Sequence, residues 1–259
     1  MFTRPASDGQ IDAPSILQRP RPPCGGCAQV NDASKKGKNG AMPGKALIDK
    51  DFIVSTLTAQ DPFCFSHGAG DTSEHLGAGI LYYALAYSLR ARTCMCLGSG
   101  GGFVPRMLRQ AQRDLELDGS RTILVDGAGK VPETKKNVWG SPAWLSEDSL
   151  FRRNYPEIEL VLELTADAYN GIFAPQGLEV EYLHIDADHH YEGVKEDWEL
   201  YKNLVPARGI ITLHDTMNYR EPCGVFRLVE EIRQLPEYSI IDLPVSFGTA
   251  IVQKNPVSR

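Results

Sequence analysis

Two apolar runs of this chain end directly on side chains that can bind a metal or move a proton. The run 183–185 is followed within five residues by Asp186, Asp188, His189 and His190. The run 209–213 is followed by His214 and Asp215. Continuous apolar runs are typical of buried parallel strands, and ligands in open α/β sheets lie beyond the carboxyl ends of such strands. The sequence therefore predicts one site to which two strands contribute carboxylates and imidazoles.

Apolar runs and helical periodicities alternate through the rest of the chain. Strands are expected at Thr93–Leu97, Arg121–Val125, Leu160–Leu164, 183–185, 209–213, Ser239–Leu243 and Thr249–Gln253. Helical spacing of apolar residues marks 76–89, 104–115, 194–205 and 225–232. This alternation predicts a Rossmann-like, doubly wound α/β fold, with a mostly parallel seven-stranded sheet and an antiparallel C-terminal hairpin.

Composition restricts the class of protein. The chain has 259 residues, of which 42% are hydrophobic and 23% charged, and these values are ordinary for a globular protein. A net charge of −6 argues against a general nucleic-acid binder, because phosphate affinity comes mainly from clustered Lys and Arg. The longest apolar helical run, 79–89, is well short of the ~20 residues that span a bilayer. The first residues lack a signal-type apolar core, so we expect a cytoplasmic protein without a membrane span.

The N-terminal segment differs from the remainder in composition. Residues 1–45 are rich in Pro, Gly and Lys, which predicts a flexible arm before a single domain at 46–259. The arm contains Cys24 and Cys27, which are either an inert thiol pair or half of a zinc site whose second pair does not follow at the usual spacing. A chain of this size does not need disulfides, so the six cysteines are expected to be mostly reduced thiols.

A glycine turn follows the first predicted strand. Its residues are Gly98, Ser99, Gly100, Gly101 and Gly102, and a helical pattern begins directly afterwards. Such a turn exposes backbone N–H groups to a phosphate or to the carboxylate of an amino-acid cofactor. Asp126 ends the next strand, where an acid can accept hydrogen bonds from ribose hydroxyls. Together the two features favour a nucleoside-containing cofactor.

Taken in this order, residues from about Thr72 to Lys254 resemble the class I S-adenosylmethionine-dependent methyltransferases. The stretch 185–194, followed by Asp197 and by 213–215, is similar to the macrocin, mycinamicin and cephalosporin-hydroxylase-like group of metal-dependent O-methyltransferases. The Asp186-Ala187-Asp188 arrangement also resembles that of the caffeoyl-CoA and catechol enzymes.

The resemblance implies a role for each site residue. S-adenosylmethionine would be held by Glu74, Gly98, Ser99, Gly100, Gly102, Asp126 and Asp167. A divalent cation would be held by Asp186 and Asp215 with His214 beside them, and His189 would be the general base. The implied acceptor is a hydroxyl of a saccharide or polyol-like small molecule. A cation lowers the pKa of such a hydroxyl while an adjacent base takes its proton.

The sequence departs from the group at two positions. His214 stands where a carboxylate or amide is common, so Mn²⁺ is an alternative to Mg²⁺. Cys96 replaces the acidic residue that usually begins the glycine motif. Asp188 is expected near the substrate or behind the ligands rather than as a ligand, and His184 is expected in the core.

Other classes stay open at this point. A metal-dependent glycosyltransferase would also use Asp186-Ala187-Asp188, although the glycine turn and the late Asp215 argue against it. A nicotinamide-dependent dehydrogenase requires G-x-G-x-x-G, which this turn does not match. A non-catalytic cofactor-binding relative is the least favoured class, because Asp186, His189 and Asp215 are all present. The sequence identifies neither the acceptor nor the oligomeric state, for which a homodimer is one option.

Overall fold

The computed structural model describes residues 76–98, 102–127, 130, 145–245 and 247–256, and the structural statements below refer to these residues. The predicted arm at 1–45 and the start of the domain at 46 lie outside them, so both stay predictions. Glu74, Ser99 and Gly100 also lie outside the described residues.

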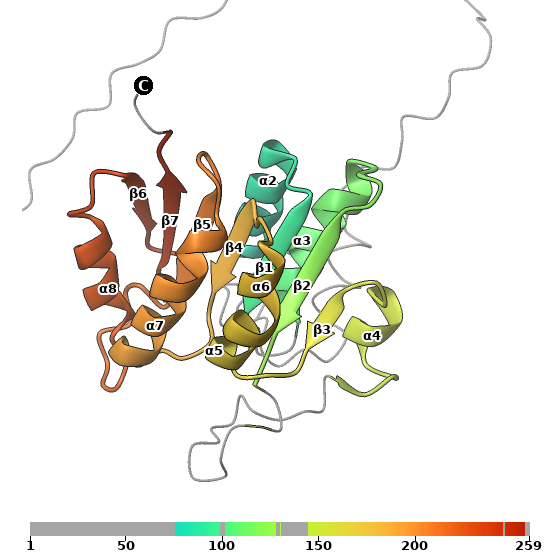
Figure 1. Cartoon of the computed structure of the whole chain (residues 1–259), viewed down its shortest axis with the longest axis horizontal. Coiled ribbons are helices and arrows are strands. Elements are labelled where there is room, and N and C mark those ends of the chain that lie inside the picture. Colours follow the sequence, from blue (N-terminus) through green and yellow to red (C-terminus); the bar gives the residue numbers. More distant parts are fainter. Residues whose placement is uncertain (1–75, 99–101, 128–129, 131–144, 246, 257–259) are drawn as a thin grey trace, which may run out of the picture. The chain divides into compact units, whose positions relative to one another are not determined.

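A seven-stranded sheet organises the described chain, in the order β3-β2-β1-β4-β5-β7-β6 (Figure 1). The strands are β1 Thr93–Leu97, β2 Arg121–Val125, β3 Glu159–Val161, β4 Tyr182–Ile185, β5 Ile210–His214, β6 Tyr238–Leu243 and β7 Thr249–Lys254. The first five strands pair in parallel, whereas β7 is antiparallel to both β5 and β6. The predicted fold class, including its antiparallel hairpin, is confirmed.

Helices cover the two faces of this sheet. They are α2 Gly79–Leu89, α3 Phe103–Asp114, α4 Leu150–Asn154, α5 Thr165–Ala168, η5 Tyr169–Phe173, α6 Ala174–Gln176, α7 Tyr191–Tyr201, η6 Lys202–Leu204 and α8 Val225–Ile232. In Figure 1, α5, α6, α7 and α8 lie in front of the strands, and α2 and α3 lie behind them. The parallel strands are therefore buried on both faces, which explains why their sequences are continuous apolar runs.

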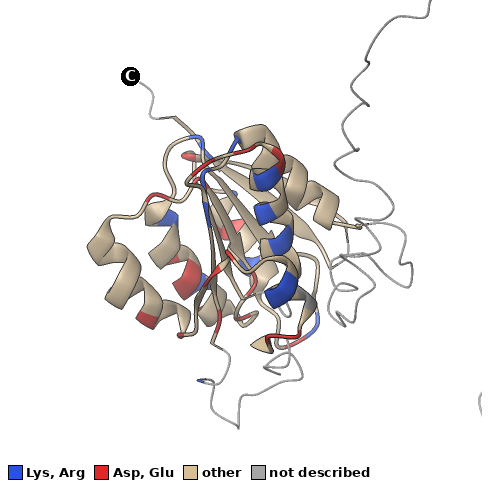
Figure 2. Ribbon diagram, turned by 90° about the vertical axis from the view of Figure 1, so that its right-hand side faces the viewer, with Lys and Arg blue, Asp and Glu red and all other residues tan. Residues whose placement is uncertain are grey.

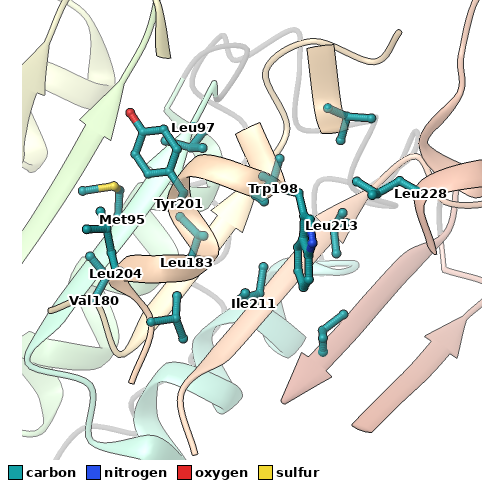
Figure 3. Close-up of a cluster of buried hydrophobic side chains, with 14 of the residues drawn as sticks. Met95, Leu97, Val180, Leu183, Trp198, Tyr201, Leu204, Ile211, Leu213 and Leu228 are labelled. Atoms are coloured by element: carbon teal, nitrogen blue, oxygen red, sulfur yellow. The ribbon is translucent and has the colours of Figure 1, made fainter. Parts of the chain in front are cut away.

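The buried hydrophobic residues form two clusters, one on each face of the sheet, because successive side chains of a strand point to opposite faces. One cluster packs alternate residues of β1, β2, β4 and β5 against α7 and α8. Figure 3 shows Leu183, Ile211 and Leu213 of this cluster beside Trp198 of α7. The other cluster packs the intervening residues against α2 and α3, and it includes Cys94 and Cys96. Both thiols are buried and free, as is that of Cys223.

The structure differs from the predicted elements mainly around β3. The strand was expected to run through Leu164, but it ends at Val161, level with the last residue of β2, Val125. Without a partner strand to extend along, the chain turns, and Leu162 and Leu164 are exposed. The short helices α4, α5 and α6 and the π-helical turn η5 were not predicted, because segments of three to five residues carry no helical periodicity.

Charged residues of both signs are distributed over the described ribbons (Figure 2). On α3, Arg109 and Arg113 both bind Glu157, and on β2 Arg121 binds Glu159. These cations therefore have acidic partners within the same domain. No helix in the described ranges is long and apolar enough to cross a membrane.

Candidate active site

The carboxyl ends of the central strands bring the predicted site residues to one edge of the sheet. Leu97 at the end of β1 pairs with Val125 of β2 and with Ile185 of β4, and Ile185 pairs with Leu213 of β5. The residues that follow these strand ends are therefore neighbours in space. They include Gly98, Asp126, Asp186, His214 and Asp215.

Asp186 and Asp215 face the same imidazole. His189 places Nε2 3.1 Å from Oδ1 of Asp186 and Nδ1 2.9 Å from Oδ2 of Asp215. Both carboxylates are nearly buried, with side chains 9% and 7% exposed, whereas that of His189 is 38% exposed. The imidazole thus lies between two carboxylates and remains open to solvent on one side.

The backbone fixes the positions of His189 and Asp215. The N–H of Gly224 donates to the carbonyl of His189 at 2.8 Å, which ties the turn before α7 to the loop before α8. Asp215 adopts a left-handed conformation with φ 60°. Asp is among the few residue types that tolerate this region, and such backbone strain concentrates at functional sites. It turns the chain directly after β5 and so sets where the Asp215 carboxylate lies.

Two further histidines approach Asp186 from the core. His214, 3% exposed, has Nδ1 3.2 Å from Oδ1 of Asp186 and 4.0 Å from Oδ1 of Asp215. His184, fully buried, has Nε2 3.8 Å from Oδ2 of Asp186. The expectation that His184 lies in the core is thus met, but its ring also faces the carboxylate of the site.

The electrostatics of this cluster favour a charged carboxylate at Asp186 and protonated imidazoles at His189 and His214. Burial by itself would lower the pKa of His189, but hydrogen bonds to Asp186 and Asp215 outweigh it and raise that pKa to about 11. Burial also opposes the charged form of His214, yet the Asp186 carboxylate raises the pKa of His214 above its ordinary value.

The pKa of Asp186 moves in the opposite direction. Burial would raise it, but the charge of His214, hydrogen bonds with His189 and His214, and the nearby ring of His184 hold the pKa well below its usual range. Burial dominates for His184 and lowers its pKa, so this imidazole is neutral at pH 7. The resemblance implied that His189 is the general base, whereas in this structure its imidazole holds its proton far above neutrality.

The donor set of this cluster fits a divalent cation. Among the residues that the structure describes, one oxygen or nitrogen from each of Asp186, His189 and Asp215 lies within 4.8 Å of the others. Carboxylate oxygens suit Mg²⁺ and Mn²⁺, and an imidazole nitrogen favours transition metals. An imidazolium between two carboxylates also shows that this point of the fold accommodates positive charge.

Asp188 and His190 lie outside this cluster. The Asp188 carboxylate accepts hydrogen bonds from the backbone N–H of His190 at 2.9 Å and contacts the His190 ring at 2.7 Å. Gly193 makes room for it, since a Cβ at Gly193 would lie 2.3 Å from Oδ2 of Asp188. Asp188 therefore shapes the turn into α7.

The glycine turn packs directly against the strand that carries Asp186. Gly98 has φ +68°, and a Cβ there would lie 2.4 Å from the carbonyl oxygen of Asp186. Gly102 has φ +84° and precedes α3, and a Cβ there would lie 2.2 Å from the ring of Phe151. Neither position can hold a larger residue without movement of its neighbours. The first turn of α3 thus begins close to the end of β1, with its N–H groups at the carboxyl edge.

The other predicted cofactor residues differ in their exposure. Asp126 follows β2, is partly buried, and its N–H donates to the carbonyl of Val161 at 3.0 Å. Asp167 lies exposed in the first turn of α5, after β3. Both are on the carboxyl side of the sheet, as predicted.

The sequence interpretation missed Thr212 and the contact between His184 and Asp186. Thr212 is buried in β5 and pairs in register with His184 of β4. The signal was present, because His184 and Asp186 are two residues apart on one strand and therefore point to the same face. An interior threonine in an apolar run carries no comparable signal.

Comparisons with known proteins agree with this arrangement. The family model described as a methyltransferase domain matches residues 95–216, which include the glycine turn, Asp186 and Asp215. A search of curated proteins finds no match.

Several solved structures share the fold. An O-methyltransferase from Bacillus cereus in complex with SAH is 16% identical, with a TM-score of 0.56 over 81% of this chain and 94% of that chain. The O-methyltransferase TomG from Streptomyces achromogenes, in complex with SAM, is 14% identical, with a TM-score of 0.55 over 82% and 93%. An SAH-bound methyltransferase from Podospora anserina is also 14% identical, with a TM-score of 0.55 over 83% and 89%. At these identities the likeness concerns the fold, which is that of the class I methyltransferases, and the family model adds a match to a methyltransferase domain over residues 95–216.

Proposed function

We propose that the protein transfers a methyl group from S-adenosylmethionine to a hydroxyl of a small molecule, with the help of a divalent cation. The observation that carries this proposal is the direct contact between the glycine turn at Gly98 and the strand end at Asp186. A methyl donor bound at the glycine turn and a hydroxyl acceptor bound near Asp186 would be neighbours.

We expect the donor to bind at the carboxyl edge of the sheet. The N-terminus of α3 offers N–H groups to the methionine carboxylate, and Asp126 offers a carboxylate to the ribose hydroxyls. Glu74, Ser99, Gly100 and Asp167 complete the proposed donor set. S-adenosylmethionine supplies an electrophilic methyl group on a sulfonium, so the protein must provide orientation and a nucleophile.

Asp186 and Asp215 would hold the cation, which supplies positive charge that lowers the pKa of a bound hydroxyl. His214 lies against Asp186 and is proposed to assist that carboxylate. His189 is the proposed base, and its two carboxylate contacts explain how it would be controlled. As long as Asp186 and Asp215 neutralise only the imidazole, His189 keeps its proton. A cation held by these carboxylates would weaken their stabilisation of the imidazolium, and His189 could then accept the proton of the hydroxyl.

The acceptor class rests on the resemblance of residues 185–194 to sugar-modifying methyltransferases. We propose a saccharide hydroxyl, with Mg²⁺ or Mn²⁺ as the cation. Vicinal phenols are the alternative, since the caffeoyl-CoA and catechol enzymes share the same Asp-Ala-Asp arrangement. We further propose that the partners are small molecules and that the enzyme forms a homodimer, which sedimentation velocity tests.

The proposal is tested by transfer of a labelled methyl group from S-adenosylmethionine to panels of saccharides and catechols. Transfer should require Mn²⁺ or Mg²⁺ and should stop with excess chelator. Asp215→Asn should stop transfer while calorimetry shows S-adenosylmethionine binding unchanged. Asp188→Asn is the matched control, because it removes a carboxylate of the same loop region that lies outside the cluster. Full transfer in chelator would refute the role of the cation, and absence of S-adenosylmethionine binding would refute the function itself.

A further inference from the structure

A row of buried polar side chains lies beneath the proposed cation site, on the side of the sheet that α2 covers. Tyr182 and His184 belong to β4, and Thr212 belongs to β5. The Thr212 hydroxyl oxygen is 3.2 Å from the Tyr182 hydroxyl and 2.8 Å from Nδ1 of His184. All three residues are fully buried. This row ends at Asp186, whose Oδ2 lies 3.8 Å from Nε2 of His184.

The hydrogens of this row can run in either of two directions, and the following direction is the one that points a hydrogen at Asp186. Tyr182 donates to Thr212, and Thr212 donates its single hydroxyl hydrogen to Nδ1 of His184. A neutral imidazole has one hydrogen, which must then be on Nε2, the nitrogen that faces Asp186. The hydroxyl of Thr212 thereby sets the tautomer that presents positive polarity to the carboxylate.

The ring of His184 is also fixed from the helix side. Tyr82 of α2 packs edge-on against it, with the ring centroids 4.9 Å apart. The Tyr82 hydroxyl is 3.4 Å from Oγ1 of Thr249 on β7. The imidazole is therefore held between Tyr82 and Thr212 without contact with solvent, and these two contacts set its direction toward Asp186.

From this geometry we propose that His184, oriented by Thr212, is a positioning residue that holds the Asp186 carboxylate in the direction required to bind the cation. The inference rests on the proposed function. Groups behind a ligand commonly orient it, and their loss weakens metal affinity or activity by about 10- to 100-fold. Burying a neutral imidazole is unfavourable unless its polar atoms have partners, so an apolar residue would serve a purely structural role better.

The test measures Mn²⁺ affinity of the full-length protein by calorimetry, with SAH affinity as the check that the fold and the donor site are intact. Thr212→Val removes the hydroxyl and keeps the volume, and it should weaken Mn²⁺ binding about tenfold or more. Thr212→Ser restores the hydroxyl and should restore affinity. His184→Phe keeps an aromatic ring, leaves Thr212 its Tyr182 partner, and should weaken Mn²⁺ binding at least as much.

Thr122→Val is the matched control. Thr122 is equally buried, lies on β2, and donates to Gln112 at 2.8 Å without any link to Asp186. It should leave Mn²⁺ affinity unchanged whatever its effect on thermal stability. If Thr212 acts through His184, the double variant should bind Mn²⁺ no more weakly than His184→Phe alone, whereas independent packing effects would add.

The outcomes separate this inference from the proposed function. If the wild-type protein binds Mn²⁺ and both Thr212→Val and His184→Phe bind it with the same affinity, the positioning role is overturned. The proposed function would remain intact. Equal weakening in Thr212→Val and Thr212→Ser would also overturn it, because the hydroxyl would then not matter. If the wild-type protein binds SAH but does not bind Mn²⁺, the role of the cation in the proposed function is refuted, and this inference is refuted with it.

Discussion

The two faces of β4 and β5 differ in what they contribute. Toward α7 and α8 these strands present only apolar side chains: Leu183, Ile185, Ile211 and Leu213. Toward α2 the same strands present Tyr182, His184, Thr212 and His214, and this series continues to Asp186. One face therefore supplies the packing that holds the strands in place, and the other supplies the polar groups that surround the carboxylate. Substitutions on the two faces should separate stability from function.

The largest effect is expected at the end of the polar face. Asp186→Asn removes the charge that faces three histidines, and we expect turnover to fall at least about 100-fold, which is the loss typical of removing one preorganised electrostatic group from an active site. Labelled-methyl transfer measures the loss, and calorimetry with SAH should show that the donor site persists. Turnover within tenfold of wild type would contradict the assignment of Asp186.

The apolar face should respond in stability alone. Leu213→Ala deletes a fully buried side chain beside Trp198 and should lower the free energy of unfolding by about 2–5 kcal/mol. Denaturant unfolding measures this loss, while Mn²⁺ affinity of the folded protein should be unchanged. A specific loss of Mn²⁺ affinity would show that the two faces are not independent.

A substitution at Gly98, which contacts the backbone of Asp186 at the end of β4, should have an intermediate effect. Gly98→Ala places a Cβ at φ +68° against the backbone of Asp186 and Ala187, so both strain and displacement are expected. The free energy of unfolding should fall by about 1–3 kcal/mol, and affinity for S-adenosylmethionine should fall with it. Gly177→Ala is the control, because Gly177 also has positive φ but open space around its Cβ position. Loss of S-adenosylmethionine affinity in both variants would show that strain, rather than the contact, is responsible.

The smallest effect is expected when the pH is changed by one unit, and it concerns the affinity for Mn²⁺. The pKa of His189 is raised from an ordinary 6.5 to about 11 in the folded protein, so the imidazole keeps its proton through the neutral range. A cation that replaces this charge must release the proton, and Mn²⁺ affinity should therefore rise up to about tenfold per pH unit between pH 6 and 8. Calorimetry in buffers of different ionisation enthalpy counts the released protons.

The same shift has a consequence for stability. Because the folded-state pKa is raised, the contribution of His189 is complete below pH 6.5 and is lost as the pH rises through about 11. Mn²⁺ affinity that does not change with pH would show that His189 stays protonated beside the bound cation.

Much of the fold could be predicted from the sequence because its strands are buried on both faces. The runs at 93–97, 121–125 and 209–213 are continuous and apolar, and each was placed to within a residue. β3 could not be bounded, since its end at Val161 depends on where the neighbouring strand β2 ends, which is a property of the sheet. The turns α5 and η5 are similarly set by tertiary packing.

The site was predictable where the chain itself brings residues together. Strand ends placed Asp186 near Asp215, and the spacing of three placed His189 within reach of Asp186. The charge state of His189 was not predictable, because it depends on the carboxylate of Asp215, which lies 26 residues away in the chain and reaches the ring only through the parallel pairing of β4 and β5.

The close approach of Gly98 to the backbone of Asp186 has a thermodynamic consequence for ligand binding. Because the two segments touch, we expect a shift of either one to displace the other, so that binding of the proposed donor and binding of the proposed cation would be linked equilibria. Linkage requires that if one ligand changes the affinity for the second by some factor, the second ligand changes the affinity for the first by the same factor. Order of addition would then alter the route to the ternary complex, but not the stability of that complex.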